Sequence, residues 1–209
     1  MQMPILIDRV RSLREARSET RILLGIAGEP GGGKSTVASS LVSALAELDI
    51  AAVVAPMDGF HLASAELERL GRTERKGAID TFDAYGYLAL LERLRQGSDE
   101  VVYAPTYLRS HEESIGSSIA VPRSVPVVIS EGNYLLAASE PWPLIRAVFD
   151  EVWFVDTPPS TRRQWLIARH EAFGKSHADA VAWVDGPDET NARLIRATRA
   201  SADFVVEVG

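Results

Sequence analysis

The stretch that decides the fold is residues 22–36, which read Ile22-Leu-Leu-Gly-Ile-Ala-Gly28-Glu-Pro-Gly-Gly-Gly-Lys34-Ser35-Thr36. Residues 22–27 form a short apolar run with the length and flanks of a buried strand. The next eight residues fit the pattern GxxxxGK[ST], and apolar residues at helical spacing follow over 34–48. A strand, a glycine-rich loop and a helix in this order predict a phosphate-binding loop.

The chemistry of such a loop explains its spacing. Glycines let backbone N–H groups close around phosphate oxygens, and the following helix presents the positive end of its dipole to the same anion. We expect Lys34 to reach the β and γ phosphates and the Ser35 hydroxyl to bind Mg²⁺. The predicted nucleotide-binding residues are Gly28, Glu29, Pro30, Gly31, Gly32, Gly33, Lys34, Ser35 and Thr36.

Apolar runs and helical patterns alternate along the rest of the chain. Amphipathic helices are expected over 4–17, 34–48, 84–95, 160–172, 177–184 and 188–200. Candidate strands are 22–27, 50–57, 101–103, 125–129, 152–155 and 204–208. This alternation predicts an α/β fold with a mostly parallel sheet and helices on both faces.

Length and composition limit the function further. The 209 residues contain no repeat or evident linker, so residues 1–209 are expected to form one domain. A net charge of −7 argues against general binding to nucleic acid or anionic membranes. The chain has no cysteine, so thiol catalysis and thiolate metal sites are excluded. No apolar run is long enough for membrane insertion, and the first 20 residues are too charged for a signal peptide, which predicts a cytoplasmic protein.

Carboxylates follow several predicted strands, at the edge where parallel sheets bind ligands. Asp58 follows the run 50–57, and Glu131 follows the run 125–129. Phosphoryl transfer to an alcohol requires a carboxylate that accepts the hydroxyl proton and a metal that bridges the phosphates. We assign Asp58 to the first role and Glu131, with Ser35, to the metal. The alternative for both carboxylates is ordinary turn chemistry before glycine.

A basic helical segment near 160–176 has the composition of a lid over the transferred phosphate. It contains Arg162, Arg163, Arg169, His170 and Lys175. Arg169, together with Asp58 and Lys34, is predicted to be catalytic. The alternative is a solvated charged helix face, which is a common arrangement.

These motifs taken together resemble those of the P-loop small-molecule kinases, a group that includes uridine kinase, phosphoribulokinase and bacterial pantothenate kinase. Within the group it is most similar to bacterial proteins described as nucleoside kinase-like or fructose transport system kinases. The resemblance covers nearly all residues after 20. It is carried by residues 28–36, Pro56 to His61, Arg75-Lys76-Gly77, Thr81-Phe82-Asp83, Pro105-Thr106-Tyr107, Glu131 to Leu136 and Arg163 to His170.

The resemblance implies the P-loop NTP hydrolase fold, ATP and Mg²⁺ as cofactors, Asp58 as the base and Glu131 as a magnesium-linked residue. The polar segments 71–82 and 108–124 fit no predicted helix or strand, so substrate loops are predicted near 59–82 and 104–124. The acceptor site that the resemblance implies consists of Asp58, Phe60, His61, Lys76, Asp83, Tyr107 and His111.

Several residues of this acceptor site have structural alternatives. Partial burial with a hydrogen-bonded tip is the alternative for His61, Tyr107 and His111, and a helix N-cap is the alternative for Asp83. The sequence departs from the uridine kinase pattern at three positions. His61 follows Phe60 where that pattern has Tyr or Phe, His111 lies four rather than five residues after Tyr107, and Leu166 stands where the pattern has an arginine. These departures argue against uridine specificity without altering the phosphate chemistry.

The leading interpretation is an ATP- and Mg²⁺-dependent kinase that phosphorylates a hydroxyl of a small metabolite, either a sugar of the fructose type or a nucleoside. The alternative is a P-loop ATPase or nucleotide switch that acts on a protein partner such as a transporter. No NKxD or LSGGQ-like motif supports the commonest forms of that alternative. The expected partner is thus a small acceptor with a hydroxyl, with a homodimer left open.

Overall fold

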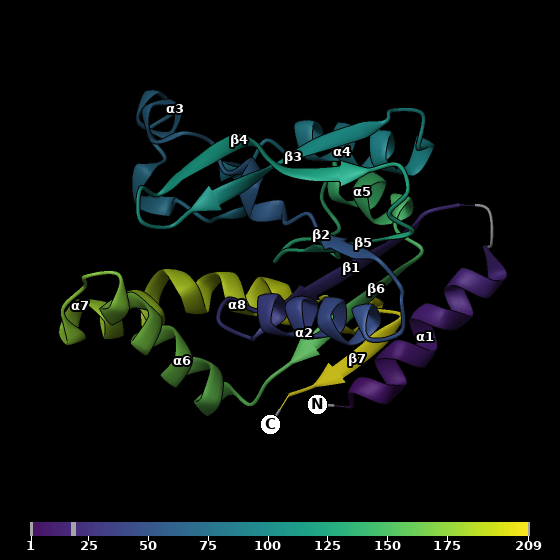
Figure 1. The fold of residues 1–209 in the computed structure, drawn as a ribbon. Helices are drawn as coiled ribbons and strands as arrows, with labels where there is room; N and C mark the ends of the chain where they lie inside the picture. The colour runs from purple at the N-terminus through teal and green to yellow at the C-terminus, as the bar shows by residue number, and fades with distance from the viewer. Residues whose placement is uncertain (1, 18–19, 209) are drawn as a thin grey trace.

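The computed structural model describes residues 2–17 and 20–208 (Figure 1). The helices are α1 (Met3–Ala16), α2 (Lys34–Ala46), α3 (Ser64–Arg69), α4 (Ala84–Gln96), α5 (Trp142–Val148), α6 (Pro159–Ala172), α7 (His177–Trp183) and α8 (Glu189–Arg196). The strands are β1 (Ile22–Gly28), β2 (Ala52–Val54), β3 (Val101–Leu108), β4 (Glu113–Pro122), β5 (Val127–Glu131), β6 (Glu151–Asp156) and β7 (Phe204–Glu207). Within these residues, no helix is long and apolar enough to cross a membrane.

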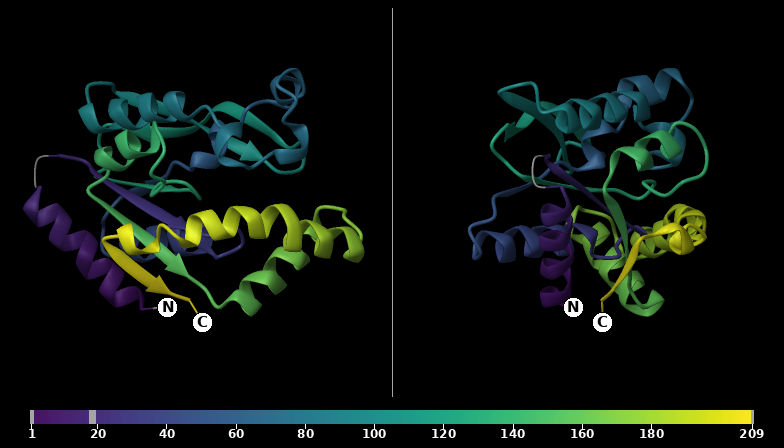
Figure 2. Two further views of the ribbon diagram at one scale, coloured as in Figure 1. Left: turned by 180° about the vertical axis from the view of Figure 1, so that it is seen from behind. Right: turned by 90° about the vertical axis from the view of Figure 1, so that its right-hand side faces the viewer.

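The main sheet has five strands in the order β2-β5-β1-β6-β7, and every neighbouring pair is parallel. β1 lies at the centre, where Leu24 is opposite Ile129 of β5 and Gly28 is opposite Val155 of β6. Figure 1 shows α2 in front of the sheet, and the view from behind in Figure 2 shows α8 on the opposite side. The predicted α/β fold with helices on both faces is confirmed.

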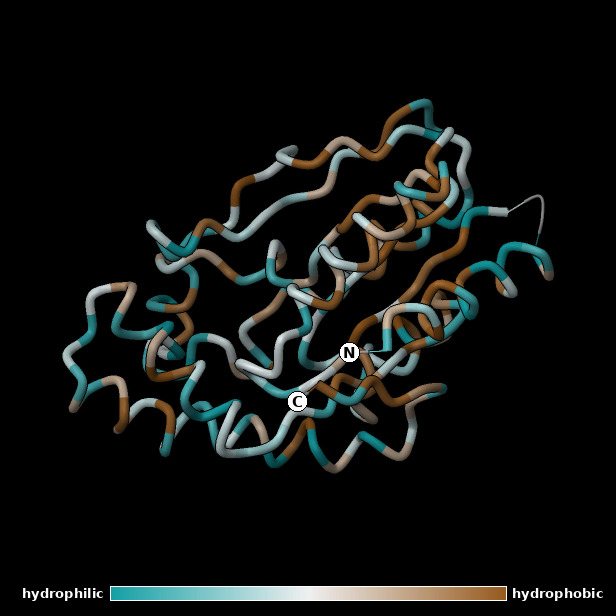
Figure 3. Tube along the Cα trace, turned by 60° about the horizontal axis from the view of Figure 1, so that its bottom comes forward, coloured by the Kyte–Doolittle hydropathy of each residue, from teal (hydrophilic) through white to brown (hydrophobic). Residues whose placement is uncertain are grey.

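Apolar side chains of β1 point alternately to the two faces of the sheet, so helices must pack on both faces. Leu23 and Ala27 belong to the core beneath α4, α5 and α8, whereas Ile22, Leu24 and Ile26 pack with α1 and α2. All five side chains are fully buried. Figure 3 shows the hydrophobic colour along the inner strands and hydrophilic colour on the outer turns. A strand buried on both faces has no polar alternation, which is why its sequence is a continuous apolar run.

The expectation for residues 101–124 is only partly correct. Residues 101–103 were predicted as a strand, but they belong to β3, which pairs antiparallel with β4 in a separate two-stranded sheet. The predicted loop near 104–124 is therefore largely a β-hairpin. Its strands are half-exposed and irregular, with a register shift between Ala104 and Thr106, so the apolar pattern in the sequence is weak.

Two further boundaries differ from prediction. The run 50–57 forms only the short strand β2, because the chain turns into a 3₁₀ helix, η1, over Met57–Phe60. The predicted helix 188–200 is divided into α8 and a 3₁₀ turn over Arg199–Ser201. A π-helical segment, η4 (Val184–Asp188), joins α7 directly to α8.

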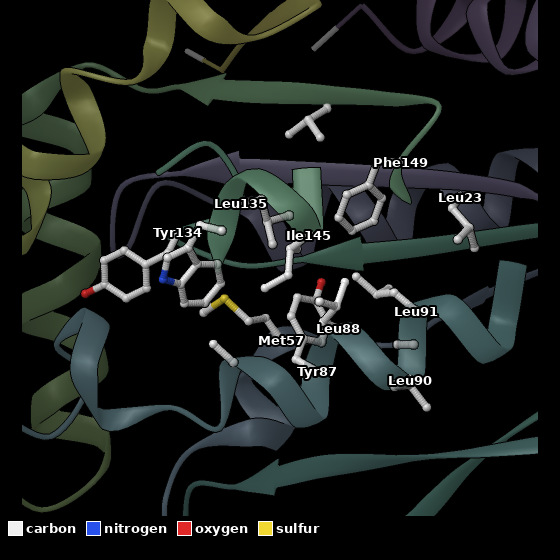
Figure 4. Packing of buried hydrophobic residues seen from close by; sticks show 14 of the residues in the cluster. Leu23, Met57, Tyr87, Leu88, Leu90, Leu91, Tyr134, Leu135, Ile145 and Phe149 are labelled. Atoms are coloured by element: carbon white, nitrogen blue, oxygen red, sulfur yellow. The ribbon is translucent and has the colours of Figure 1, made fainter. Parts of the chain in front are cut away.

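Figure 4 shows Tyr87 among the hydrophobic residues of the core beneath α4, where its hydroxyl takes part in a buried polar link that we expect to be stabilising. Tyr87 and Ser130 are fully buried, their hydroxyl oxygens lie 2.6 Å apart, and Ser130 donates to the Ala55 carbonyl. Tyr87→Phe should lower the free energy of unfolding by about 1–2 kcal/mol, because the Ser130 oxygen loses its buried donor. Urea unfolding measures this change, with Tyr85→Phe as the control because Tyr85 lies on the same helix and is exposed. Equal stability of the two variants would contradict the prediction.

Candidate active site

The glycine-rich loop joins β1 to α2. Gly31 and Gly33 have φ angles of +72° and +86°, which favour glycine, and α2 begins at Lys34. The Lys34 ammonium donates to the carbonyls of Gly28 and Glu29 at 3.0 and 3.1 Å, and to Asn133 Oδ1 at 2.6 Å. Burial lowers the pKa of Lys34. The lysine therefore lies under the loop beside a side chain from the end of β5.

Helix α6 packs directly on this loop. An ideal Cβ on Gly31 would lie 2.3 Å from the Leu166 Cγ, so neither the φ angle nor the space there suits a side chain. Leu166 is fully buried, which explains why an apolar residue stands at this position. The contact fixes α6 against the loop that is expected to hold the phosphates.

Gly31→Ala should lower the free energy of unfolding by about 2–3 kcal/mol, through backbone strain and the clash with Leu166. Gly97→Ala is the matched control, because Gly97 also has a positive φ of +61° but an added Cβ would meet nothing within 4 Å. The control should lose only about 1 kcal/mol from backbone strain. Denaturant unfolding of both variants measures the difference. Equal losses would show that the contact with α6 is unimportant.

Two carboxylates approach the loop from neighbouring elements. Glu131 is the last residue of β5, and its Oε1 accepts from the Ser35 hydroxyl at 3.0 Å. Burial raises the pKa of Glu131, and the charge of nearby Asp58 raises it further. Asp58 lies in η1, one turn beyond β2, rather than at a strand end. The edge of the sheet nevertheless brings both predicted carboxylates to Lys34, whose pKa is influenced by both charges.

A cavity of about 620 Å³ opens between the loop, η1, the hairpin and α6. Its lining includes many of the residues predicted for the site: Pro30, Gly31, Gly33, Lys34, Ser35, Thr36, Asp58, His61, Lys76, Tyr107, Glu131 and Arg169. Burial lowers the pKa of Arg169. Residues separated by more than 100 positions in the sequence thus face one space.

The cavity has an aromatic wall formed by residues that were predicted for the acceptor site. The His61 ring lies 4.4 Å from the Tyr107 ring and 4.1 Å from the Phe82 ring, measured between centroids. His61 Nδ1 is 2.7 Å from the Asp58 carbonyl oxygen, and burial lowers the pKa of His61. Burial raises the pKa of Tyr107 to about 12. Both side chains therefore present neutral rings beside Asp58 at neutral pH.

Three residues predicted for the acceptor site do not line this cavity. Phe60 packs against Tyr87 in the core, with ring centroids 5.2 Å apart. Asp83 caps α4 by accepting from the Gly86 N–H at 2.8 Å, which is the structural alternative for this residue. His111 is exposed in the hairpin turn and lies 2.9 Å from the Ser110 hydroxyl. These three side chains therefore lie outside the cavity lining in this structure, and their contact with an acceptor stays a prediction.

Arg162 also differs from the expected lid arginine. It is buried, and its guanidinium forms ion pairs with Glu29 at 3.0 Å and with Glu189. Arg196 donates two hydrogen bonds to the same Glu29 carboxylate, at 2.8 and 2.7 Å. Glu29 therefore connects the loop to α6 and α8 through its side chain, and only its backbone is available to the phosphates.

Several cavity residues were missed by the sequence analysis. Asn133 binds Lys34, Arg109 donates to Asp58 at 3.1 Å, and Asp188 lies 2.8 Å from His170 Nε2. Trp165 also lines the cavity. The position of Asn133 two residues after Glu131 was a usable signal, since it follows the same strand end. Arg109 carried no comparable signal, because only the hairpin pairing brings it to Asp58.

The family model described as "Phosphoribulokinase / Uridine kinase family" matches residues 23–209. A Schizosaccharomyces pombe protein provisionally named uridine kinase C227.14 is 29% identical over 94% of this chain and 87% of its own length. The uncharacterized protein YggC of Escherichia coli is 30% identical over 97% of this chain and 84% of its own. A crystal structure from Silicibacter sp. TM1040, provisionally assigned as a fructose transport system kinase, is 35% identical, covers 99% of both chains and superposes with a TM-score of 0.91. This chain therefore belongs to the phosphoribulokinase/uridine kinase family and is a kinase that phosphorylates an alcohol group of a small metabolite.

Proposed function

We propose that this kinase transfers the γ-phosphate of ATP, in the presence of Mg²⁺, to a hydroxyl of a sugar of the fructose type or a nucleoside. The observation that carries the proposal is the shared cavity in which Lys34, Asp58, Glu131 and Arg169 meet. Lys34 and Arg169 supply positive charge, Asp58 supplies a base, and Ser35 with Glu131 supplies oxygen ligands. These are the groups that phosphoryl transfer requires.

The proposed chemistry assigns one role to each group. The acceptor hydroxyl oxygen forms a bond to the γ-phosphorus, the bond from that phosphorus to the bridging oxygen breaks, and ADP leaves. Asp58 accepts the hydroxyl proton. Lys34 and Arg169 stabilise the charge on the migrating group, and the backbone N–H groups of residues 28–36 hold the phosphates.

The donor set fits Mg²⁺. Mg²⁺ usually takes one or two protein oxygens and completes its shell with water and substrate phosphates. The Ser35 hydroxyl and the Glu131 carboxylate, 3.0 Å apart, match this requirement. Mg²⁺ at these residues would neutralise phosphate charge.

The acceptor and the lid are part of the same proposal. Residues 59–82 and 104–124 contribute His61, Lys76 and Tyr107 to the cavity, which supports their role as acceptor loops within a single domain over 1–209. The segment 160–176 contributes Arg169, His170 and Lys175, which supports its role as a lid. The name provisionally given to the similar Silicibacter structure favours fructose as the first acceptor to test.

The test is ADP release from ATP and Mg²⁺ with fructose, other sugars, nucleosides, pantothenate or ribulose 5-phosphate, beside a control without acceptor. Strong stimulation by a sugar or nucleoside is the expected result. Stimulation by pantothenate or ribulose 5-phosphate alone would overturn the proposed acceptor class. Equal release in every reaction would favour the alternative, an ATPase or switch that acts on a protein partner such as a transporter.

A further inference from the structure

Arg109 lies at the turn of the β3–β4 hairpin and contacts the proposed base directly. Its Nη2 donates to Asp58 Oδ2 at 3.1 Å, and both side chains line the cavity. Among the residues that the structure describes, no other side chain or backbone N–H donates to the Asp58 carboxylate, so Oδ1 is available to a further donor. One oxygen of the carboxylate is thus held by Arg109, and the side chain lines the cavity.

The hairpin that carries Arg109 is fixed to the turn that carries Asp58. An ideal Cβ on Gly59 would lie 2.5 Å from the Pro105 carbonyl oxygen, so the two backbones are in direct contact. The Ser114 hydroxyl donates to the His61 carbonyl at 3.1 Å, and Glu113 accepts from the Ser64 N–H at 3.0 Å. These contacts tie the hairpin to the segment that directly follows Asp58. Arg109 is therefore delivered to the carboxylate by tertiary packing.

The ring of Tyr107 adds a second restraint on the guanidinium. The Arg109 Cζ lies 6.0 Å from the centroid of this ring, at the outer limit of a cation–π contact. Burial is the main cause that lowers the pKa of Lys34 and of Arg169, and the positive charge of Arg109 lowers both pKa values further. The guanidinium therefore contacts the proposed base and lines the same cavity as Lys34 and Arg169.

We infer that Arg109 is a positioning residue for phosphoryl transfer: it holds Oδ2 of Asp58 so that Oδ1 is directed at the acceptor hydroxyl. This inference rests on the proposed role of Asp58 as the base. A base that must meet a hydroxyl at hydrogen-bond distance loses efficiency when its carboxylate can rotate, and a neighbouring donor removes that freedom. Arginine suits this role because its planar group presents fixed donors to a carboxylate.

The test compares steady-state kinetics of Arg109→Gln and Arg109→Lys, each made in the wild-type chain and in the Asp58→Asn variant. In the wild-type chain, Arg109→Gln should lower kcat by about 10- to 100-fold with the KM for ATP within about twofold, and Arg109→Lys should recover part of the loss. In the Asp58→Asn chain, Arg109→Gln should change kcat by less than about twofold, because a residue that acts through Asp58 has nothing left to position.

The control is Arg93→Gln. Arg93 is an exposed arginine on α4 that lies outside the cavity lining and forms an ion pair with Asp99 at 2.9 Å. The kcat of this variant should equal that of the wild-type chain. Wild-type kcat in Arg109→Gln overturns the inference. An equal fall of kcat in both backgrounds, or a change confined to the KM for the acceptor, also overturns it, the latter because it indicates direct acceptor binding. Wild-type turnover in Asp58→Asn would instead refute the part of the proposed function that assigns Asp58 as the general base.

Discussion

Lys34→Ala is expected to lower kcat by about 10³-fold or more, because it removes a positive charge that acts in a site shielded from water. The ammonium is buried and contacts the loop carbonyls of Gly28 and Glu29 together with Asn133. Its lowered pKa results first from this burial, which is also the condition under which a charge stabilises a developing anion most strongly. The loss should therefore fall on the chemical step.

Steady-state assays of ADP formation with an established acceptor measure this effect. Lys76→Ala provides a useful comparison, because Lys76 is another cavity lysine and lies in the proposed acceptor site, with its ammonium 5.6 Å from the Tyr107 centroid. That variant should change the KM for the acceptor more than kcat. Wild-type kcat in Lys34→Ala would refute the assignment of the phosphate-binding loop.

Asp58→Asn is expected to lower kcat by about 10²- to 10⁴-fold, which is the usual contribution of a positioned general base. The amide keeps the size of the side chain but cannot accept the hydroxyl proton. Nucleotide binding should change little, because Asp58 lies in η1, whereas the phosphates are expected at residues 28–36. The loss of kcat compared with the loss of ATP affinity distinguishes a general base from a residue that binds ATP.

Pre-steady-state rates and ATP affinity measured on the same Asp58→Asn protein provide this ratio. Asp80→Asn is the control for removing a carboxylate from the neighbouring loop, because Asp80 pairs with Arg72 and Arg75 outside the cavity. A variant at Asp58 that loses ATP affinity while keeping the rate of the chemical step would show that Asp58 is not the base.

Local sequence patterns were sufficient to predict the phosphate-binding loop and the central strands of the sheet. The continuous apolar run at 22–27 reflects a strand covered on both faces, and the glycines reflect backbone angles that other residues adopt at a cost. Ser35 and Glu131 could both be assigned to the proposed metal site from the sequence, because the carboxyl ends of parallel strands share one edge of the sheet. Each of these inferences depends on short-range spacing and one general rule of sheet topology.

Other features depended on contacts between distant segments. Asp83 was expected at the acceptor, but it caps α4 because its side chain meets the Gly86 N–H, and both roles suit an aspartate at that position. Arg162 was expected in a lid or, as the alternative, on a solvated helix face, but Glu29 and Glu189 pair with it in the interior. Composition alone does not distinguish a buried ion pair from an exposed charge.

By itself, the sequence determined the glycine-rich loop of this kinase, where a contiguous segment supplies most of the proposed phosphate-binding groups through its backbone. Only the tertiary structure decided how the proposed acceptor site is assembled, because η1, the β3–β4 hairpin and α6 bring Asp58, Arg109 and Arg169 to one cavity. The physical reason is the range of the interactions. Backbone angles and hydrophobic periodicity are encoded over a few residues, whereas the Asp58–Arg109 contact joins positions 51 residues apart and exists only after the hairpin has packed on η1.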